Sequence, residues 1–424
     1  MLNPQVTRRS GPHPWWVAVI AGMASFVDGA ALSANGWALV ILQDAIGLSG
    51  GQFGALTAAT TVGLAIGALV GGRLGDVYGR RRVFMVTLGL VVVASFAPML
   101  SHNFWVLLLG LTVLGIGAGA DLPVSLATIA EAADDHNRGA MLGFTHALWI
   151  LGSLVILVTT ALIGDQGIAA VRVLYGIIVV VGAIGLLLRL TIPESPAWLA
   201  TREERRQGIP TVRSEGVKLR DLMSNPLRRV VLMLAAFYAL VSITGNVLAG
   251  YIAYIATNVA DISIEAISGP AALLYPFGFV ALFVFMRLVD TRLRMPMYIW
   301  GGVVFAGALL IPVFFGISLV SLLLCFGLSA LGGMVSGGEP MARVWCNESF
   351  PTMLRSTGQG VVFTVGRLAV AASAAIAPAV ISWSPDAFFL GLFATAALGT
   401  LIGWFGFRGE RAVNEFDRER ELVA

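Results

Sequence analysis

The chain has 424 residues, of which 57% are hydrophobic and only 12% are charged, and its mean hydropathy is +0.86. Soluble proteins carry about 25% charged residues, so the composition excludes an ordinary soluble domain and predicts a surface that faces lipid. The formal net charge of +3 identifies no nucleic-acid partner, and the 2 cysteines and 4 histidines indicate neither a disulfide framework nor a metal centre.

Long apolar runs follow one another through the whole chain. A helix needs roughly 20 apolar residues to cross the hydrocarbon core, and about twelve runs reach that length. They are residues 14–40, 53–72, 83–100, 104–130, 140–163, 169–192, 229–257, 268–288, 296–315, 317–345, 357–383 and 386–407. We interpret the first as an uncleaved span, because Asp28 interrupts its apolar core and no small-residue cleavage site follows.

The one long polar connection, residues 193–228, divides this all-α membrane protein into an N-terminal six-helix bundle (1–192) and a C-terminal six-helix bundle with a short tail (229–424). Arginines concentrate in this connection and in alternate loops, whereas the opposite loops contain no Lys or Arg and only Arg172 lies near that other face. The positive-inside rule therefore predicts that both termini and the connection are cytoplasmic. We expect a multi-pass protein of a cell membrane, most simply a bacterial inner membrane, acting as a monomer among lipids.

Two sequence features recur at nearly the same distance along the chain. The segment 71–82, which is rich in glycine and arginine, returns in weaker form as 287–294, and the two copies lie 214 residues apart (287 − 73). A Glu seven residues before an Arg occurs twice, and those copies lie 217 residues apart (348 − 131). Such agreement indicates a duplicated unit, as in secondary transporters with internal repeats.

These loop motifs resemble a known family. Gly75-Asp-x-x-Gly-Arg-Arg81 is similar to the best-known motif of the major facilitator superfamily. Pro193-Glu-Ser-Pro-Ala-Trp-Leu199 and Glu348-Ser-Phe-Pro-Thr-Met-Leu-Arg355 resemble motifs of its sugar porter family, and the residues around Trp345 look most like bacterial inositol-type transporters. The resemblance covers nearly the whole chain and implies a two-bundle carrier that works by alternating access.

The charged loop residues have a physical reason to recur. Arg and acidic side chains at helix ends can pair with neighbouring helices and helix dipoles in one state of a carrier and separate in the other. We therefore predict a cytoplasmic gate, the alternative being charges that only set topology. Its residues are Arg73, Asp76, Gly79, Arg80, Glu131, Arg138, Arg287, Asp290, Glu348 and Arg355.

Ionisable residues inside spans are the candidates for proton coupling, because a bare charge is costly in the bilayer. The resemblance implies that Asp28, mid-way along the first span, is the proton site. The Arg that sugar porters place on the fourth span is replaced by Leu111. Asp121 follows in the same span, and we expect it either to share a proton with Asp28 or to cap a helix broken near Pro123. The glycines between 115 and 119 indicate close helix packing rather than a nucleotide loop.

The tenth span carries Glu339 and Arg343, which are four residues apart and share a helix face. Sugar porters have a Gly and a substrate-stacking Trp at these positions, so the resemblance is weakest here. We assign Glu339 to proton coupling, and Arg343 with Arg367 of the next span to substrate binding. A structural ion pair is the alternative.

Further substrate-binding candidates follow from the family pattern. His146 stands where sugar porters place a sugar-binding Gln, and it could instead be a packing histidine. Trp149 belongs to the cavity or to the core. Asn246 and Tyr251 lie near the family's polar cluster on the seventh span, although the family's Gln pair is Val241-Ser242 here.

The sequence thus predicts a proton-coupled symporter for a small polar solute, such as inositol, with the proton as coupling ion and no other cofactor. The main alternative is an organic-acid or aromatic-acid proton symporter, because Arg343, Arg367 and His146 could receive a carboxylate. A non-transporting nutrient sensor is a more remote alternative. An enzyme is not expected, since no nucleophile and base are grouped together.

Overall fold

The computed structural model describes residues 12–101, 103–132, 138–194, 227–289, 291–335, 338–350 and 355–408, together with Leu199 and Glu203. Within this part of the chain every regular element is helical. The first half contains α1 (Pro14–Ile46), α2 (Gly50–Tyr78), α3 (Arg80–Ala94), α4 (Phe96–Leu100), α5 (Phe104–Ala132), α6 (Arg138–Ile163), the 3-10 turn η1 (Gly164–Gln166) and α7 (Ile168–Arg189). The second half contains α10 (Leu227–Asn258), α11 (Ile264–Ala272), α12 (Tyr275–Leu288), α13 (Arg294–Ala308), α14 (Ile311–Phe315), α15 (Leu319–Val335), α16 (Gly338–Ser349), α17 (Arg355–Trp383) and α18 (Pro385–Phe407).

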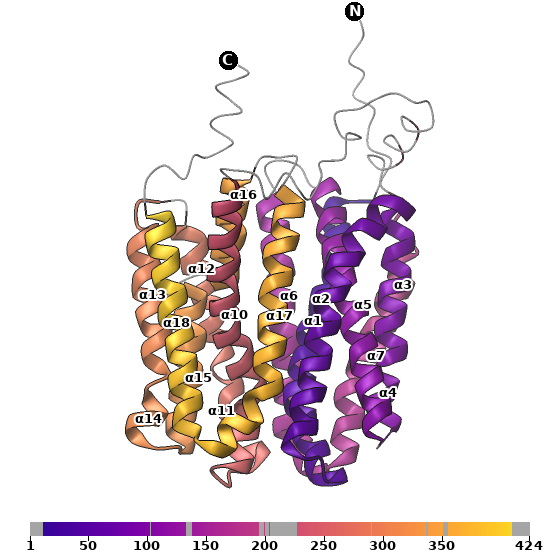
Figure 1. The fold of residues 1–424 in the computed structure, drawn as a ribbon. Helices are drawn as coiled ribbons and strands as arrows, with labels where there is room; N and C mark the ends of the chain where they lie inside the picture. Colours follow the sequence, from indigo (N-terminus) through magenta and orange to yellow (C-terminus); the bar gives the residue numbers. More distant parts are fainter. Residues whose placement is uncertain are drawn as a thin grey trace, which may run out of the picture.

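The helices run side by side, with those of the first half to the right and those of the second half to the left in Figure 1. Among the described residues, 12 helical stretches are long and apolar enough to cross a membrane, which confirms the number of spans that the apolar runs predict. Large apolar side chains such as Leu109, Phe283 and Trp300 are exposed on the outer surface. An exposed apolar surface of this extent is what a lipid-facing protein requires.

Three spans are interrupted at residues that the structure describes, and a proline explains each of these interruptions. A proline removes the hydrogen bond to the residue four positions earlier and clashes with its carbonyl. The helix α3 ends at Ala94, four residues before Pro98; α11 ends at Ala272 before Pro276, and α13 ends at Ala308 before Pro312. The short helices α4, α12 and α14 then continue the same spans.

Small residues set the closest contacts between spans. A Cβ on Gly63 would lie 2.3 Å from the carbonyl oxygen of Thr112, and one on Gly115 would lie 2.2 Å from that of Thr60. The backbones of α2 and α5 therefore touch, as small residues permit in membrane helices. The predicted packing role of the glycines between 115 and 119 is confirmed, since Gly119 meets the backbone of Leu64 in the same way.

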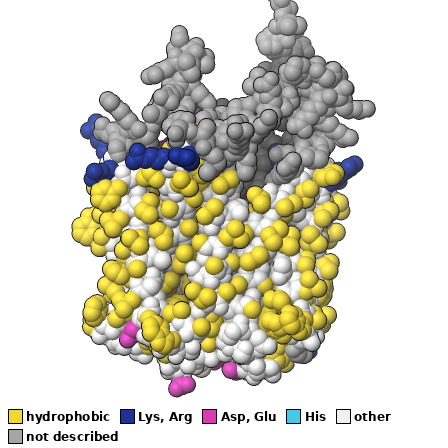
Figure 2. Space-filling view, viewed as in Figure 1, with side chains coloured by type: hydrophobic (Ala, Val, Ile, Leu, Met, Phe, Trp, Pro, Cys, Tyr) yellow, Lys and Arg dark blue, Asp and Glu magenta, His cyan; other side chains and the backbone are white. Residues whose placement is uncertain are grey.

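Charge divides the molecule into two ends. Figure 2 shows Lys and Arg side chains along one end and acidic side chains at the other, with an apolar belt between them. We call these the basic end and the acidic end. The exposed acidic residues at the acidic end lie in the last turn of α1, in η1, in the connection after α10 and in the first turn of α18, and they are Asp44, Asp165, Asp261 and Asp386. The two kinds of charge are separated as the loop composition predicts.

Candidate functional site

Asp28 lies in the middle of α1 and is only 6% exposed. Its Oδ2 atom accepts a hydrogen bond from Nε1 of Trp149 on α6, at 3.0 Å. The sequence places Asp28 inside a span, and the structure agrees. It also gives Trp149 a definite role that sequence reasoning leaves open, because the indole is bonded to the acid rather than simply packed in the core.

Glycines fix the geometry of this pair. A Cβ on Gly29 would lie 2.2 Å from the carbonyl oxygen of Trp149, and one on Gly152 would lie 2.1 Å from that of Phe26. The hydroxyl of Ser153 donates to the carbonyl of Gly29 at 3.1 Å. The backbones of α1 and α6 are therefore in contact on both sides of the pair, which sets the height of the indole beside the acid.

His146 lies one turn before Trp149 on α6, and both side chains are half-buried. Their rings are parallel within 2°, with centroids 5.9 Å apart. Side chains three positions apart share a helix face, so His146 belongs to the same surface as the acid and its tryptophan. Asp28, His146 and Trp149 form one cluster, which we call the acid cluster.

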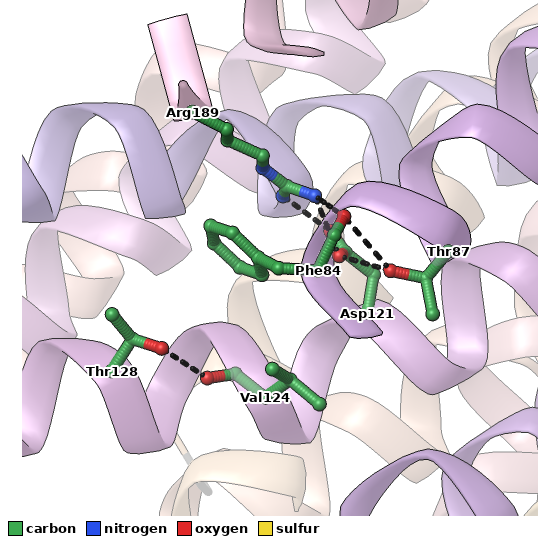
Figure 3. Close-up of polar contacts among 6 residues, drawn as sticks. All are labelled: Phe84, Thr87, Asp121, Val124, Thr128 and Arg189. Carbon is green, nitrogen blue, oxygen red and sulfur yellow. Dashed lines mark hydrogen bonds and ion pairs between the residues drawn. The ribbon is translucent and has the colours of Figure 1, made fainter. Parts of the chain in front are cut away.

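Asp121 does not belong to the acid cluster. Its two carboxylate oxygens bind the guanidinium of Arg189 on α7, at 2.8 and 2.6 Å, and Oδ1 also accepts from the hydroxyl of Thr87 on α3 at 2.7 Å. Arg189 also donates to the carbonyl of Phe84 and lies 3.4 Å from the centroid of its ring. Figure 3 shows these side chains converging from α3, α5 and α7. We call these four residues the arginine cluster.

This geometry corrects the expectation for Asp121. The carboxylate is engaged by a guanidinium rather than shared with Asp28. Arg189 and Asp121 have side chains that are 0% and 3% exposed, and a two-point Arg–carboxylate pair is among the strongest hydrogen-bonded arrangements in proteins. The alternative that a helix breaks near Pro123 is also wrong, because α5 continues from Phe104 to Ala132.

The second-half candidates lie on α10, α16 and α17. Asn246 is exposed and donates to the carbonyl of Ser242 on its own helix at 3.0 Å. Tyr251 is 0% exposed and donates to the carbonyl of Ala374 on α17, so in this conformation it packs two helices together. Arg343 is half-buried on α16.

Arg367 connects the two halves of the chain. Its guanidinium donates to the carbonyl of Leu64 on α2 at 3.1 Å. It therefore lies where α17 packs against α2, one of the largest contacts between the two halves. The side chain reaches a backbone oxygen that small neighbouring residues leave accessible, an arrangement that the sequence does not indicate.

The two halves also touch along α1 and α10, near the acidic end. A Cβ on Gly36 would lie 3.5 Å from the Cα of Gly250. Two turns further on, Nε2 of Gln43 donates to Oδ1 of Asn258 at 3.1 Å, and Nδ2 of Asn258 donates back at 3.3 Å. These partners are 214 (250 − 36) and 215 (258 − 43) residues apart, which is the spacing of the repeated loops. Each residue therefore touches its own counterpart in the other half, as happens at a two-fold axis.

At the basic end, Gly79 ends α2 and precedes α3 with φ of 99°, a conformation that glycine adopts without strain. Arg80 is half-buried and Arg287 is exposed. Glu348 binds Arg294 through two contacts of 2.8 and 3.0 Å, and their side chains are 21% and 25% exposed. The predicted gate residue Glu348 is thus engaged with the counterpart of Arg80 in the repeat.

Several predicted residues have side chains outside the part of the chain that the structure describes, so their roles stay predictions. They are Arg73, Asp76, Glu131, Arg138, Asp290, Glu339 and Arg355. Most of the connection 193–228 is also outside it. Among the described residues no group of three or more His, Cys, Asp and Glu could hold a metal ion.

Sequence reasoning overlooked two residues that the structure makes prominent. Arg189 stands among leucines near the end of the sixth apolar run, and an arginine in such a run is a signal for a buried partner. Arg294 appears in the repeat alignment as the counterpart of Arg80, but its partner lies 54 positions away in sequence. Only the folded chain brings these pairs together.

Comparisons with known proteins agree with this architecture. The chain is 26% identical over 391 residues to the minor myo-inositol transporter IolF of Bacillus subtilis (strain 168), covering 90% of this chain and 86% of that protein. It is 28% identical over 407 residues to the cis,cis-muconate transport protein of Acinetobacter baylyi, covering 92% and 93% of the two chains. The inward open structure of the xylose transporter XylE from E. coli shares the fold, with a TM-score of 0.77 at 17% identity over 95% of this chain and 99% of that one.

The family model described as Major Facilitator Superfamily matches residues 21–287. That match spans more than half of the chain, and the relatives named above are transporters rather than enzymes. The resemblance of the loop motifs is therefore confirmed at the level of the superfamily, and the chain belongs to the Major Facilitator Superfamily of membrane transporters.

Proposed function

We propose that this protein is a proton-coupled symporter that moves a small polar solute, most simply a polyol such as inositol, by alternating access. The observation that carries the proposal is Asp28, a carboxylic acid that is 6% exposed in the middle of a span. An ionisable side chain at such a depth is expensive to keep and usually serves transport. Its setting between α1 and α6 lets a single proton change the charge of the site.

The contacts between the halves support alternating access. The pairs Gly36–Gly250 and Gln43–Asn258 lie toward the acidic end of α1 and α10. With the basic end in the cytoplasm, as the positive-inside rule favours, this conformation is closed toward the outside. Rocking of the two six-helix bundles, residues 1–192 and 229–424, would separate these pairs and close the basic end, where the Arg294–Glu348 pair lies.

The test uses purified protein in lipid vesicles with labelled myo-inositol. An inside-alkaline pH gradient should drive accumulation above the external concentration. Asp28→Asn should abolish this accumulation while internal label still exchanges for external myo-inositol. Accumulation by Asp28→Asn on the same gradient would exclude Asp28 as the coupling site.

Transport of an organic acid is the second candidate, and the 28% identity to a cis,cis-muconate transport protein over 92% of the chain favours it. Arg343 and His146 would then neutralise a carboxylate, while Arg367 would have to leave its contact with Leu64. Competition distinguishes the candidates. Excess unlabelled cis,cis-muconate should leave myo-inositol uptake unchanged for a polyol carrier, and muconate uptake without myo-inositol uptake would establish the acid carrier.

A further inference from the structure

The acid cluster contains a donor beside the proposed proton site that the family resemblance does not supply. Trp149 donates its indole N–H to Oδ2 of Asp28 at 3.0 Å. An indole is a donor only, so it can neither accept the proton of the acid nor replace it with a charge. Its hydrogen bond is strongest when the carboxylate is ionised, because hydrogen bonds to charged acceptors are about twice as strong as neutral ones.

The position of this donor is fixed by the fold rather than by its own side chain alone. The contacts of Gly29 and Gly152 bring the α1 and α6 backbones together, and the hydroxyl of Ser153 adds a hydrogen bond to Gly29. On its other side the indole is parallel to the His146 ring. Because the indole is already held on both sides, its side chain loses little further conformational entropy when the carboxylate becomes charged.

We propose that Trp149 is a positioning residue for proton release, which holds the ionised Asp28 in place when the proton leaves. In the release step the O–H bond of the acid breaks, the electron pair stays on the carboxylate, and the proton passes to water. The indole N–H then stabilises the charge that remains. This inference rests on the proposed role of Asp28 in symport.

The helices that pack against α1 carry other ionisable groups, which have partners or positions of their own. His146 is the titratable side chain that contacts the indole. Among the other helices packed on α1, Asp121 of α5 and Arg189 of α7 bind each other, and Arg228 and Arg229 begin α10 at the basic end. Tyr275, which begins α12, hydrogen-bonds Ser33 of α1 and Ser153 of α6. Its phenol and those of the tyrosines on α7 and α10 keep their protons at neutral pH. The charged side chains of α2 lie outside the described part.

The test compares Trp149→Phe with the parent protein. Phenylalanine keeps an aromatic ring on this helix face and removes the N–H donor together with part of the volume of the indole. Infrared spectra of the reconstituted protein report the C=O stretch of the protonated carboxyl, which Asp28→Asn assigns by its loss. The pH at which half of the protonated Asp28 band is lost should be higher in Trp149→Phe by roughly one unit, since a charge-assisted hydrogen bond corresponds to roughly a tenfold change in the equilibrium. In vesicles that contain Trp149→Phe, a pH gradient should also drive several-fold less accumulation of labelled solute, whereas exchange of internal for external solute should be retained.

Trp345→Phe is the matched control, because it removes a fully buried indole from an aromatic group in the second half, and it should leave the Asp28 band unchanged. A band in Trp149→Phe that titrates as in the parent overturns the inference. If Trp149→Phe does not fold, the parent protein still tests the inference. Its tryptophan absorption spectrum should change as Asp28 titrates, and this change should be absent in Asp28→Asn. The spectra need no substrate, so absence of coupled transport in the parent would refute the proposed function separately.

Discussion

Removing the charge of Asp121 should destabilise the protein without removing its coupling. Asp121→Asn keeps the shape of the side chain but leaves the guanidinium of Arg189 buried at 0% exposure without an opposite charge. Breaking a buried ion pair from one side costs about 3–5 kcal/mol. The asparagine can still accept one hydrogen bond, so we expect the lower limit, about 3 kcal/mol. At about 2 °C per kcal/mol for a large chain, the melting temperature should fall by roughly 6 °C.

The double variant Asp121→Leu/Arg189→Met separates charge from packing. It removes both charges and fills the site with apolar atoms, a replacement that is often neutral or stabilising in buried pairs. The melting temperature should therefore return to within a few degrees of the parent, about 1 kcal/mol in stability. Together with the single variants Asp121→Leu and Arg189→Met, the double variant forms a cycle that measures the coupling between the residues.

The assay is thermal unfolding of the purified protein, followed by accumulation of labelled solute on a pH gradient in vesicles at a temperature where all variants are folded. Asp28→Asn is the matched control, since it neutralises an acid that lies in another cluster. We expect Asp121→Asn to lose stability and keep coupled accumulation, and Asp28→Asn to do the reverse. An Asp121→Asn protein as stable as the parent but unable to accumulate solute would show that Asp121 carries the proton after all.

Three further results follow from other contacts. Cysteines replacing Gln43 and Asn258, whose amides are 3.1 Å apart, should be joined by a short, reducible thiol cross-linker, which should stop transport until it is cleaved. Continued transport by fully cross-linked protein would contradict a gate there. Gly29→Ala should prevent accumulation of folded protein, because its Cβ would lie 2.2 Å from a backbone oxygen, whereas Gly278→Ala, with nothing within 4 Å, should express normally. Arg294→Ala should lower the free energy of unfolding by only about 1 kcal/mol, because the pair that it breaks is partly exposed. It should nevertheless change the transport rate. An unchanged rate would show that this pair has no gating role and that its charges only set the topology.

The number and place of the spans could be predicted because the bilayer imposes one length on every helix. The 12 spans follow from runs of apolar residues alone. The interruptions at Ala94, Ala272 and Ala308 were not predicted, although each has a proline four residues later. The signal was present, but a proline is also accommodated inside α17 at position 378. Whether a proline ends a helix depends on neighbours that can bind the freed carbonyl, which the local sequence does not specify.

The candidate site could be predicted only in part, for a different reason. Asp28 stands out in any apolar run, because a single carboxylate there is unusual. Its donor lies 121 positions away, and Asp121 and Arg189 are 68 positions apart. Helix packing determines which face of each span meets which neighbour. Two acids on spans expected to meet suggest a shared proton, but the carboxylate of Asp121 binds Arg189 of a third span, and the local sequence does not indicate that contact.

The duplication of the chain explains where contacts are symmetric and where chemistry is not. Gly36 contacts Gly250 and Gln43 contacts Asn258, each its own counterpart. Equivalent positions of the two repeats therefore form the contact that closes one end between the halves. The position 214 residues after Asp28 is Ser242, and that after Arg189 is Gly403, neither of which is ionisable. A gate between two similar halves benefits from matched surfaces, because the same contact serves both partners. Under the proposed function, the acid Asp28 and its donor Trp149 lie in the first half without ionisable counterparts at the repeat spacing, so the duplicated contacts serve the gate while proton coupling uses residues that the repeat does not copy.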